Sequence, residues 1–180
     1  MVNVFYVLVA FLCGSLPFSV WIGRLALQTD IRGVGDGNPG ATNVLQAGGS
    51  LWGLLAVVLD FAKGAIPVAI FNYEWGLTGG WLTAVSLAPI LGHAFSPFLR
   101  FRGGKALAVT FGIWTGLTLW LAPTVLGLAF AVWVSILKKD AWAVLLGLVT
   151  LLIVLLLFVP DPVYGWVWIG NFLILGWKHR

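Results

Sequence analysis

The sequence D-I-R-G-V-G-D-G-N-P-G-A-T-N-V-L-Q at residues 30–46 holds four glycines, a proline, two asparagines and a threonine between long apolar segments. A connection between membrane helices needs only a few polar residues, whereas this composition is typical of a loop that folds back on itself. Glycine permits positive φ and close backbone approach, so consecutive N–H groups can point inward and form an anion-binding nest. We therefore predict that this glycine-rich loop holds a phosphate group at a membrane surface.

The composition is that of an integral membrane protein. The 180 residues are 61% hydrophobic and 9% charged, and the mean hydropathy is +1.02, whereas a soluble domain carries about 25% charged residues. Eleven Trp and twelve Phe fit aromatic belts at the two membrane interfaces. The single Cys13 is interpreted as a packing residue. Lysine and arginine bias in cytoplasmic loops explains the formal charge of +4, so nucleic acid is not an expected partner.

Seven apolar segments predict an all-α integral membrane protein, with residues 1–180 forming a single transmembrane domain. The expected spans are residues 2–21, interrupted at 14–17, then 51–71, 81–99, 106–120, 123–137, 141–159 and 163–177. A perpendicular helix needs about 20 residues to cross a bilayer, so the fourth, fifth and seventh segments are short. Five spans with two re-entrant pieces therefore remain an alternative.

The placement of charge predicts the orientation of these spans. Nine of the ten Lys and Arg fall in alternate connections and at the C-terminus, and the tenth, Lys63, lies inside the second span. The opposite connections hold Glu74 and Asp161. By the positive-inside rule, the N-terminus is outside, and the C-terminus and both glycine-rich elements face the cytoplasm.

Two nucleotide-binding motifs are excluded by their context. Residues 35–40 formally match G-x-G-x-x-G, but the dinucleotide fingerprint requires a strand before it and a helix opening within it. A membrane span precedes this stretch, and Pro39 interrupts it. A Walker A motif is excluded because Ala106, rather than Ser or Thr, follows Gly104-Lys105.

The phosphate nest requires only backbone donors together with the side chains of Asn38, Thr42 and Asn43. The structural alternative is a tight re-entrant turn whose asparagines cap short helices.

A second glycine-rich element favours the phosphate site. Gly103, Gly104 and Lys105 precede an expected membrane helix, where backbone donors, the positive helix end and an ammonium group would act together on an anion. The alternative is that the basic residues of this stretch only snorkel to the cytoplasmic membrane surface. That interpretation would not require the two adjacent glycines. His93, just upstream, is interpreted either as a bonded histidine inside the bundle or as a catalytic base.

One pair of charges lies within the second span. Asp60 and Lys63 are spaced i, i+3 and therefore share a helix face. Charges inside a membrane usually pair within the bundle, so a structural ion pair is expected. A pair that also positions the glycine-rich loop is the alternative.

Three blocks of the sequence match the motifs of a known family. They are G-D-G-N-P-G-A-T-N-V-L at residues 35–45, D-F-A-K-G at 60–64 and G-H-A-F-S-P-F-L-R-F-R-G-G-K at 92–105. They resemble the bacterial acyl-phosphate:glycerol-3-phosphate acyltransferases (PlsY-type), over most of residues 10–112. The resemblance implies a seven-span protein of the bacterial plasma membrane with its active site at the cytoplasmic face. Such enzymes transfer an acyl group from acyl phosphate to the 1-hydroxyl of glycerol 3-phosphate, giving lysophosphatidic acid and phosphate for phospholipid biosynthesis.

The resemblance also implies the site residues and partners. An acyl phosphate is already activated, so no cofactor or metal is expected, and positioning with charge stabilisation would supply most of the acceleration. The expected partners are acyl phosphate, glycerol 3-phosphate and membrane lipid, and the expected state is a monomer. The implied catalytic residues are His93, Lys105 and His179, and the implied substrate-binding residues are Gly35, Asp36, Gly37, Asn38, Gly40, Thr42, Asn43, Gly103, Gly104 and Lys139.

The sequence departs from the family pattern at several of these positions. Asp36 replaces the usual Ser, Gln46 the usual Arg and Ala106 a further glycine. Lys138 and Lys139 lie where the family has a serine pair, and we expect these lysines to restore positive charge. Beyond the position of Arg180, family members normally continue with an Asn and a basic tail. The departures leave two alternatives, namely a catalytically altered relative that binds a phosphorylated lipid or acceptor, and a small anion transporter.

Overall fold

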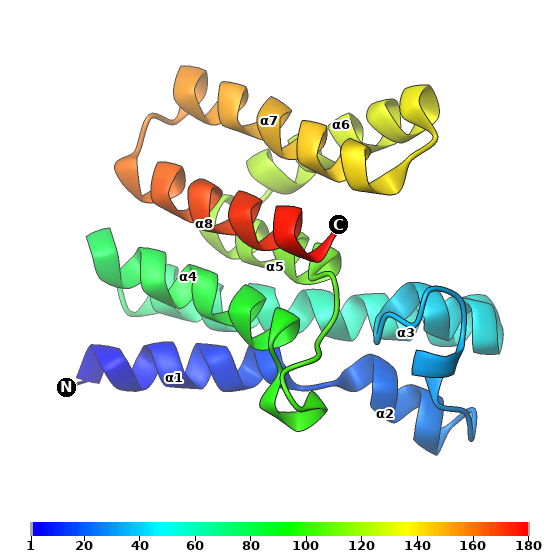
Figure 1. The fold of residues 1–180 in the computed structure, drawn as a ribbon. Coiled ribbons are helices and arrows are strands. Elements are labelled where there is room, and N and C mark those ends of the chain that lie inside the picture. Colours follow the sequence, from blue (N-terminus) through cyan, green and yellow to red (C-terminus); the bar gives the residue numbers. More distant parts are fainter. Residues whose placement is uncertain (1, 180) are drawn as a thin grey trace.

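A computed structural model describes residues 2–179, and within this range the chain is helical and has no β-strand. The longer helices run along one general direction, and the short α2 extends beyond the end of α1 (Figure 1). The elements are α1 (Val2–Ser15), α2 (Phe18–Leu25), the 3₁₀ turn η1 (Ile31–Gly33), α3 (Ala41–Ala69), the π-helical turn η2 (Ile70–Glu74), α4 (Gly79–Ala94), the 3₁₀ turn η3 (Pro97–Leu99), α5 (Leu107–Thr118), α6 (Leu121–Leu137), α7 (Asp140–Phe158) and α8 (Pro162–Lys178).

The lengths of these helices agree with the predicted all-α membrane fold. Among the residues that the structure describes, four helical stretches are long and apolar enough to cross a membrane, namely Asn3–Leu25, Ala41–Glu74, Gly79–Leu99 and Ala141–Phe158. α5 has 12 residues, which corresponds to about 18 Å and is shorter than a bilayer core. One face of α5 is buried along its whole length, so protein surrounds much of this short helix.

The start of the second span was predicted wrongly. We expected it at residue 51, but α3 begins ten residues earlier at Ala41. Gly49 adopts φ 77° and ψ −173° inside this helix, a conformation that glycine tolerates and that joins two helical pieces at a kink. The glycine-rich loop therefore ends at Gly40, and Thr42 and Asn43 lie in the first turn of α3.

The predicted interruption of the first span is confirmed by the break between α1 and α2. Pro17 lacks an N–H group and ends the hydrogen-bond ladder there. Side chains from other elements satisfy the carbonyl groups that the break leaves open. Ser96 Oγ donates to the Ser15 carbonyl at 2.6 Å, and Lys63 Nζ donates to the Leu16 carbonyl at 2.8 Å. Such pairing is needed because lipid supplies no hydrogen bonds to a broken helix.

Two helix pairs pack at close range through glycine. A Cβ on Gly92 of α4 would collide with the Phe11 carbonyl of α1, and a Cβ on Gly112 of α5 would collide with the Phe61 carbonyl of α3. Small residues allow this approach, which drives helix association where lipid removes the hydrophobic driving force.

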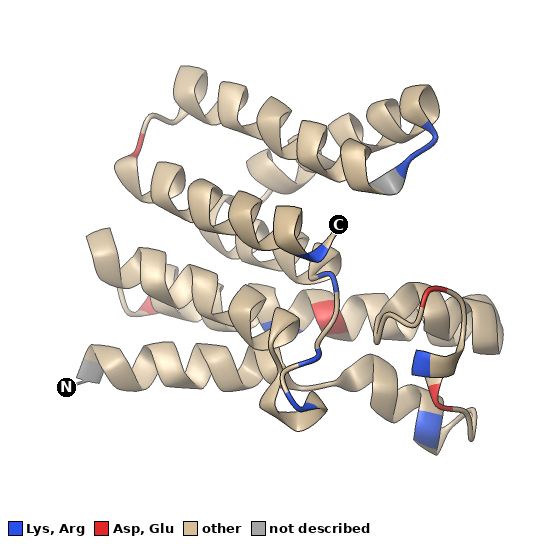
Figure 2. Cartoon of the chain, in the orientation of Figure 1, with Lys and Arg blue, Asp and Glu red and all other residues tan. Residues whose placement is uncertain are grey.

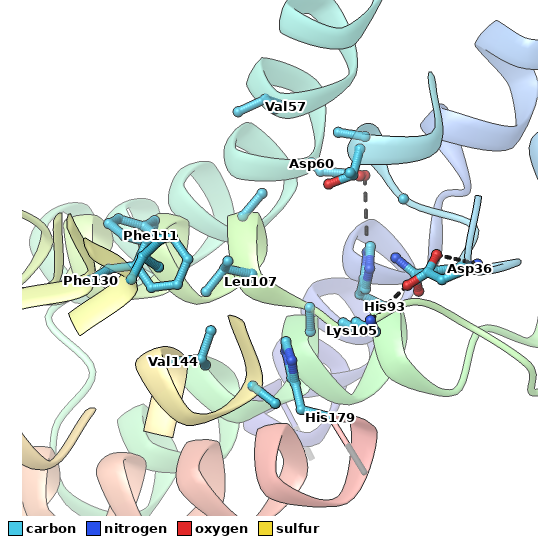
Figure 3. Close-up of a pocket in the computed structure, with 18 residues that line it drawn as sticks. Asp36, Val57, Asp60, His93, Lys105, Leu107, Phe111, Phe130, Val144 and His179 are labelled. Carbon is cyan, nitrogen blue, oxygen red and sulfur yellow. Dashed lines mark hydrogen bonds and ion pairs between the residues drawn. The ribbon is translucent and has the colours of Figure 1, made fainter. Parts of the chain in front are cut away.

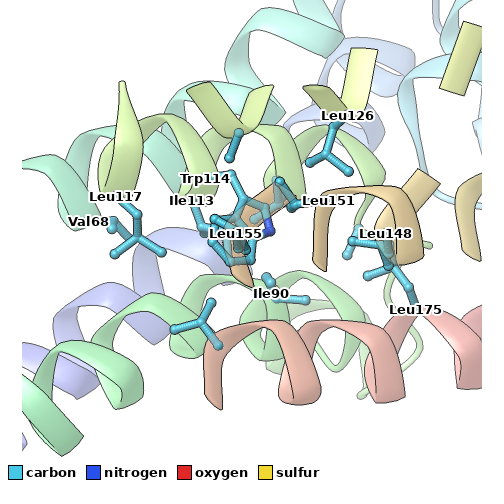
Figure 4. Close-up of a cluster of buried hydrophobic side chains, with 14 of the residues drawn as sticks. Val68, Ile90, Ile113, Trp114, Leu117, Leu126, Leu148, Leu151, Leu155 and Leu175 are labelled. Carbon is cyan, nitrogen blue, oxygen red and sulfur yellow. The ribbon is translucent and has the colours of Figure 1, made fainter. Parts of the chain in front are cut away.

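The core lies between α5, α7 and α8 and is centred on Trp114, which is fully buried (Figure 4). Its indole N–H donates to Asn171 Oδ1 at 3.0 Å, and Asn171 Nδ2 donates to Thr110 Oγ1 at 3.0 Å. The aliphatic residues packed around Trp114 include Ile90, Ile113, Leu117, Leu148, Leu151, Leu155 and Leu175.

Most charged residues gather at one end of the bundle, whereas Glu74 and Asp161 lie at the other (Figure 2). The charged end includes the α2–α3 loop, the α4–α5 connection, the α6–α7 turn and the end of α8. Both glycine-rich elements therefore lie at the same end, where they can contribute to one site.

Candidate active site

A cavity of about 510 Å³ opens at the charged end of the bundle (Figure 3). Its polar part is lined by Asp36, Asn38, Gly40, Thr42, Asp60, His93, Lys105 and His179. Its apolar part is lined chiefly by Val57, Leu107, Phe111, Phe130, Val134 and Val144. The cavity thus joins a charged end to a hydrophobic wall contributed by α3, α5, α6 and α7.

The glycine-rich loop is folded around the side chain of Asn43. Asn43 Nδ2 lies 2.7 Å from the Val34 carbonyl, 2.8 Å from the Asn38 carbonyl and 3.2 Å from Asp36 Oδ1. Asn43 itself is only 1% exposed. Its amide group is therefore engaged in holding the loop, and in this structure it lies beneath the cavity rather than on its wall.

Positive φ values explain the glycines within this loop. Gly35 has φ 57° and Gly37 has φ 75°, a region that a residue with a Cβ rarely adopts. These two glycines shape the turn, but neither lines the cavity.

An ion pair connects the two glycine-rich elements. Lys105 Nζ lies 2.7 Å from Asp36 Oδ2, while Asp36 Oδ1 accepts a hydrogen bond from the backbone N–H of Asn38 at 3.1 Å. The hydrogen bond from Lys105 is the main cause that lowers the pKa of the Asp36 carboxyl below its ordinary value. Lys105 and Asn43 therefore both contact one carboxylate.

The N-terminus of α3 forms part of the cavity wall. Gly40 caps this helix, and Ala41 and Thr42 line the cavity. The first N–H groups of a helix have no partner within it and carry the positive end of the helix dipole, so they favour an anion. This feature was missed by the sequence analysis because α3 was expected to begin at residue 51.

The α4–α5 connection differs from the expected anion nest. The Gly103 N–H donates to the Ala94 carbonyl at 3.2 Å, and the Gly104 N–H donates to the His93 carbonyl at 3.1 Å. The expectation that these two amides are open to phosphate is therefore wrong for this conformation. The glycines instead allow close packing, because a Cβ on either residue would collide with His93. They hold Lys105 at the cavity.

Ala106, which replaces a family glycine, has φ 61°. This left-handed conformation is the one that glycine adopts most readily, so the resemblance and the backbone agree at this position.

A buried network lies beneath the polar part of the cavity. Lys63 Nζ is 2.7 Å from Asp60 Oδ1, and both side chains are 3% exposed. Ser19 Oγ donates to Asp60 Oδ2 at 2.9 Å. His93 Nδ1 lies 3.9 Å from Asp60 Oδ1, so the imidazole contacts this network and lines the cavity as well (Figure 3). The predicted i, i+3 ion pair is confirmed, and Asp60 also lines the cavity.

The end of α8 is attached to the α4–α5 connection by Lys178. Its ammonium group donates to the Gly103 carbonyl at 2.8 Å and to the Ala94 carbonyl at 3.1 Å. It also lies 5.5 Å from the centre of the Phe95 ring. This attachment brings His179 to the cavity wall, although it joins residues about 75 positions apart in the sequence.

The structure brings seven of the predicted site residues to the cavity, namely Asp36, Asn38, Gly40, Thr42, His93, Lys105 and His179. Gly35, Gly37, Asn43, Gly103 and Gly104 support the site from behind. Lys139 is exposed on the α6–α7 turn and does not line the cavity.

Besides the N-terminus of α3, three further contributors to the site were not predicted from the sequence. The position of Asp60 inside a membrane span was informative, because a charge there is costly. It was interpreted as half of a structural ion pair and not as a residue that lines the cavity. Lys178 was counted solely among the positive-inside residues. The aromatic wall of Phe111 and Phe130 had no signal, since aromatic residues in apolar helices are usually core residues.

Comparison with known proteins assigns this arrangement to a family. The family model described as glycerol-3-phosphate acyltransferase matches residues 4–180. Glycerol-3-phosphate acyltransferase 1 of Thermotoga maritima is 40% identical over 195 aligned positions, covering 100% of this chain and 95% of the relative. The Methylobacillus flagellatus glycerol-3-phosphate acyltransferase is 35% identical over 99% of this chain and 90% of its own.

Two solved structures of PlsY (YgiH), an integral membrane glycerol 3-phosphate acyltransferase, share the fold. The glycerol 3-phosphate form superposes with a TM-score of 0.87 at 32% identity. The lysophosphatidic acid form superposes with a TM-score of 0.85 at 31% identity. Both comparisons cover 100% of this chain and 89% of the other. The chain is therefore an integral membrane protein that belongs to the glycerol-3-phosphate acyltransferase family.

Proposed function

We propose that the protein transfers a fatty acyl group from acyl phosphate to the 1-hydroxyl of glycerol 3-phosphate, giving lysophosphatidic acid and phosphate. The observation that carries this proposal is the two-part cavity, in which an ammonium group and a helix N-terminus lie at one end and an apolar wall at the other. An acyl phosphate has the same two parts. The names of the relatives support the acceptor, and the resemblance supports the donor.

Lys105 is the residue to which we assign phosphate binding. Its side chain is 40% exposed and faces the cavity beside the N-terminus of α3. Asn38 and Thr42 line the same part and supply side-chain donors. An ammonium group, amide and hydroxyl donors and a helix dipole converging on one point are suited to a phosphoryl group.

The reaction follows from the chemistry of the donor. The acceptor hydroxyl oxygen forms a bond to the acyl carbon, and the bond from that carbon to the phosphate oxygen breaks. The hydroxyl proton is finally carried by the departing phosphate, which leaves as hydrogen phosphate. Lys105 stabilises the charge that grows on the leaving group, and His179 lies where it can hold the acceptor or move its proton. His93 orients these groups from the buried side.

The apolar wall of the cavity is assigned to the acyl chain. Phe111 and Phe130 face the cavity from α5 and α6, away from Lys105 (Figure 3). Burial of a chain there stabilises binding by about 0.8 kcal/mol for each methylene. Binding at both ends places the acyl carbon between them, near Lys105 and His179.

The site belongs at the cytoplasmic face in this proposal. The positive-inside rule supports that orientation, because lysines and arginines gather at the end that carries the cavity (Figure 2). We assign the protein to the bacterial plasma membrane and expect it to act as a monomer.

Release of inorganic phosphate from acyl phosphate by the purified protein tests the proposal. We expect release that depends on glycerol 3-phosphate, and a loss of about 100-fold in Lys105→Ala because a charge-stabilising donor is removed. Ser135→Ala is the matched control, since this exposed hydroxyl donates only to the Val132 carbonyl within α6. Equal rates in the wild type and Lys105→Ala would refute the assigned site. Binding of either phosphate compound without turnover would identify a catalytically altered relative instead.

A further inference from the structure

Asp36 is the exposed acid of the cavity. Within residues 2–179, Asp36 and Asp60 are the acids that line it. Asp60 is buried and paired with Lys63, whereas the Asp36 side chain is 50% exposed and contacts Lys105. A negative charge thus lies at the point to which phosphate binding is assigned.

The contacts of Asp36 are those that a phosphate oxygen would make. One carboxylate oxygen lies 2.7 Å from the Lys105 ammonium. The other accepts hydrogen bonds from the Asn38 N–H at 3.1 Å and from Asn43 Nδ2 at 3.2 Å. An ammonium group and two amide donors form an anion-binding set, and its member at the cavity wall for which a phosphate would compete with the carboxylate is the Lys105 ammonium.

We propose that Asp36 determines the phosphate specificity of the site by acting as an internal anion, which a substrate phosphate must displace from Lys105. This inference rests on the proposed function only in assigning phosphate to Lys105. While Asp36 occupies Lys105, phosphate cannot bind there. The apparent affinity for phosphate is therefore the intrinsic affinity multiplied by the fraction of molecules in which Lys105 is available.

Displacement leaves the carboxylate near the bound phosphate. The half-exposed side chain has room to turn away from Lys105, but the loop that carries it stays folded around Asn43. Repulsion between like charges then acts against headgroups with additional negative charge. The site is therefore suited to a single phosphate monoester, and it retains product phosphate weakly.

Removal of the charge tests this inference directly. In Asp36→Asn and Asp36→Ser, the affinity for inorganic phosphate, measured by thermal shift of the detergent-purified protein, is expected to rise about two- to fivefold, in the range of an exposed ion pair. The asparagine variant keeps an acceptor for Asn38 and Asn43, so it preserves the loop. Asp30→Asn is the matched control. Asp30 lies in the same loop and pairs with Arg32 and Arg24, but it does not line the cavity.

Kinetic measurements identify the phosphate concerned. A fall in KM for acyl phosphate in Asp36→Asn assigns Lys105 to the donor, and a fall in KM for glycerol 3-phosphate assigns it to the acceptor. Either result supports the inference. It is overturned if neither Asp36 variant binds phosphate more tightly, or if Asp30→Asn has an equal effect.

The same measurements separate this inference from the proposed function. Phosphate binding by thermal shift requires no turnover, so it reports on Asp36 even in a protein that transfers no acyl group. Absence of phosphate release by the wild type would refute the proposed reaction alone.

Discussion

Removal of one member of the Asp60–Lys63 pair is expected to destabilise the protein more than removal of both. Lys63→Met leaves the buried Asp60 carboxylate with the Ser19 hydroxyl as its hydrogen-bond donor and His93 Nδ1 3.9 Å away, and it removes the donor to the Leu16 carbonyl. Breaking a buried pair costs about 3–5 kcal/mol, because an uncompensated charge stays in a low-dielectric site.

The double variant Asp60→Asn/Lys63→Met removes both charges. It still lacks a donor to the Leu16 carbonyl, so we expect a cost of about 1–3 kcal/mol, the penalty for one unsatisfied buried group. For a protein of this size, about 1 kcal/mol shifts Tm by about 2–4 °C. Lys63→Met should therefore lower Tm by about 6–20 °C and the double variant by about 2–12 °C, with the single variant the less stable of the two.

Thermal unfolding of the detergent-purified variants is the assay, with Ser135→Ala as a control that should stay within about 0.5 kcal/mol of the wild type. Equal Tm values for the single and double variants would refute the argument from an uncompensated charge. Activity of the double variant then distinguishes the two roles of the pair. If the fold persists but kcat falls, the pair also positions His93, and if kcat is unchanged, the pair is only structural.

Three further perturbations follow from the geometry of the site. Lys178→Met frees the end of α8 from the α4–α5 connection and misplaces His179, so kcat should fall about tenfold or more, and an unchanged kcat would contradict this attachment. Phe130→Ala joins the main cavity to a small adjoining void of about 10 Å³ that shares Phe130 in its wall. The acyl-chain profile should then shift towards longer chains by about fourfold in KM for each methylene accommodated, and an identical profile would remove Phe130 from the chain site. The lowered pKa of Asp36 means that its pair with Lys105 stabilises the fold above the ordinary value of 3.8 and loses that contribution as the pH falls. The Tm difference between wild type and Asp36→Asn should therefore be constant from about pH 5 to 8 and change below about pH 4. A difference that changes between pH 6 and 8 would assign the effect to another group.

The class of fold was predictable because its signals are local. Apolar run length and the bias of basic residues identified the helices and the charged end before any contact was known. The location of both glycine-rich elements at the same end followed from that topology, whereas the ion pair between Asp36 and Lys105 was not predicted. The start of α3 was not predictable in this way, because it depends on Gly49 adopting a kinked conformation inside a helix.

The supporting contacts of the site were less predictable because they join distant residues. The side chain of Asn43 is bound by carbonyls of the preceding loop, and the sequence does not show that the loop returns to it. The N–H groups of Gly103 and Gly104 donate to carbonyl groups at the end of α4. The stretch that was expected to bind phosphate through these amides therefore packs against α4 instead. The attachment of Lys178 depends on how α8 packs, and no local pattern signals it.

The two parts of the cavity come from largely separate stretches of the chain. Residues 36–105 and His179 form the charged end, whereas most of the hydrophobic wall comes from residues 107–144. Headgroup and tail recognition can therefore diverge independently as the sequence evolves. A chimera that carries the α6–α7 hairpin of a relative would inherit that relative's preference for fatty chains while keeping its own handling of phosphate.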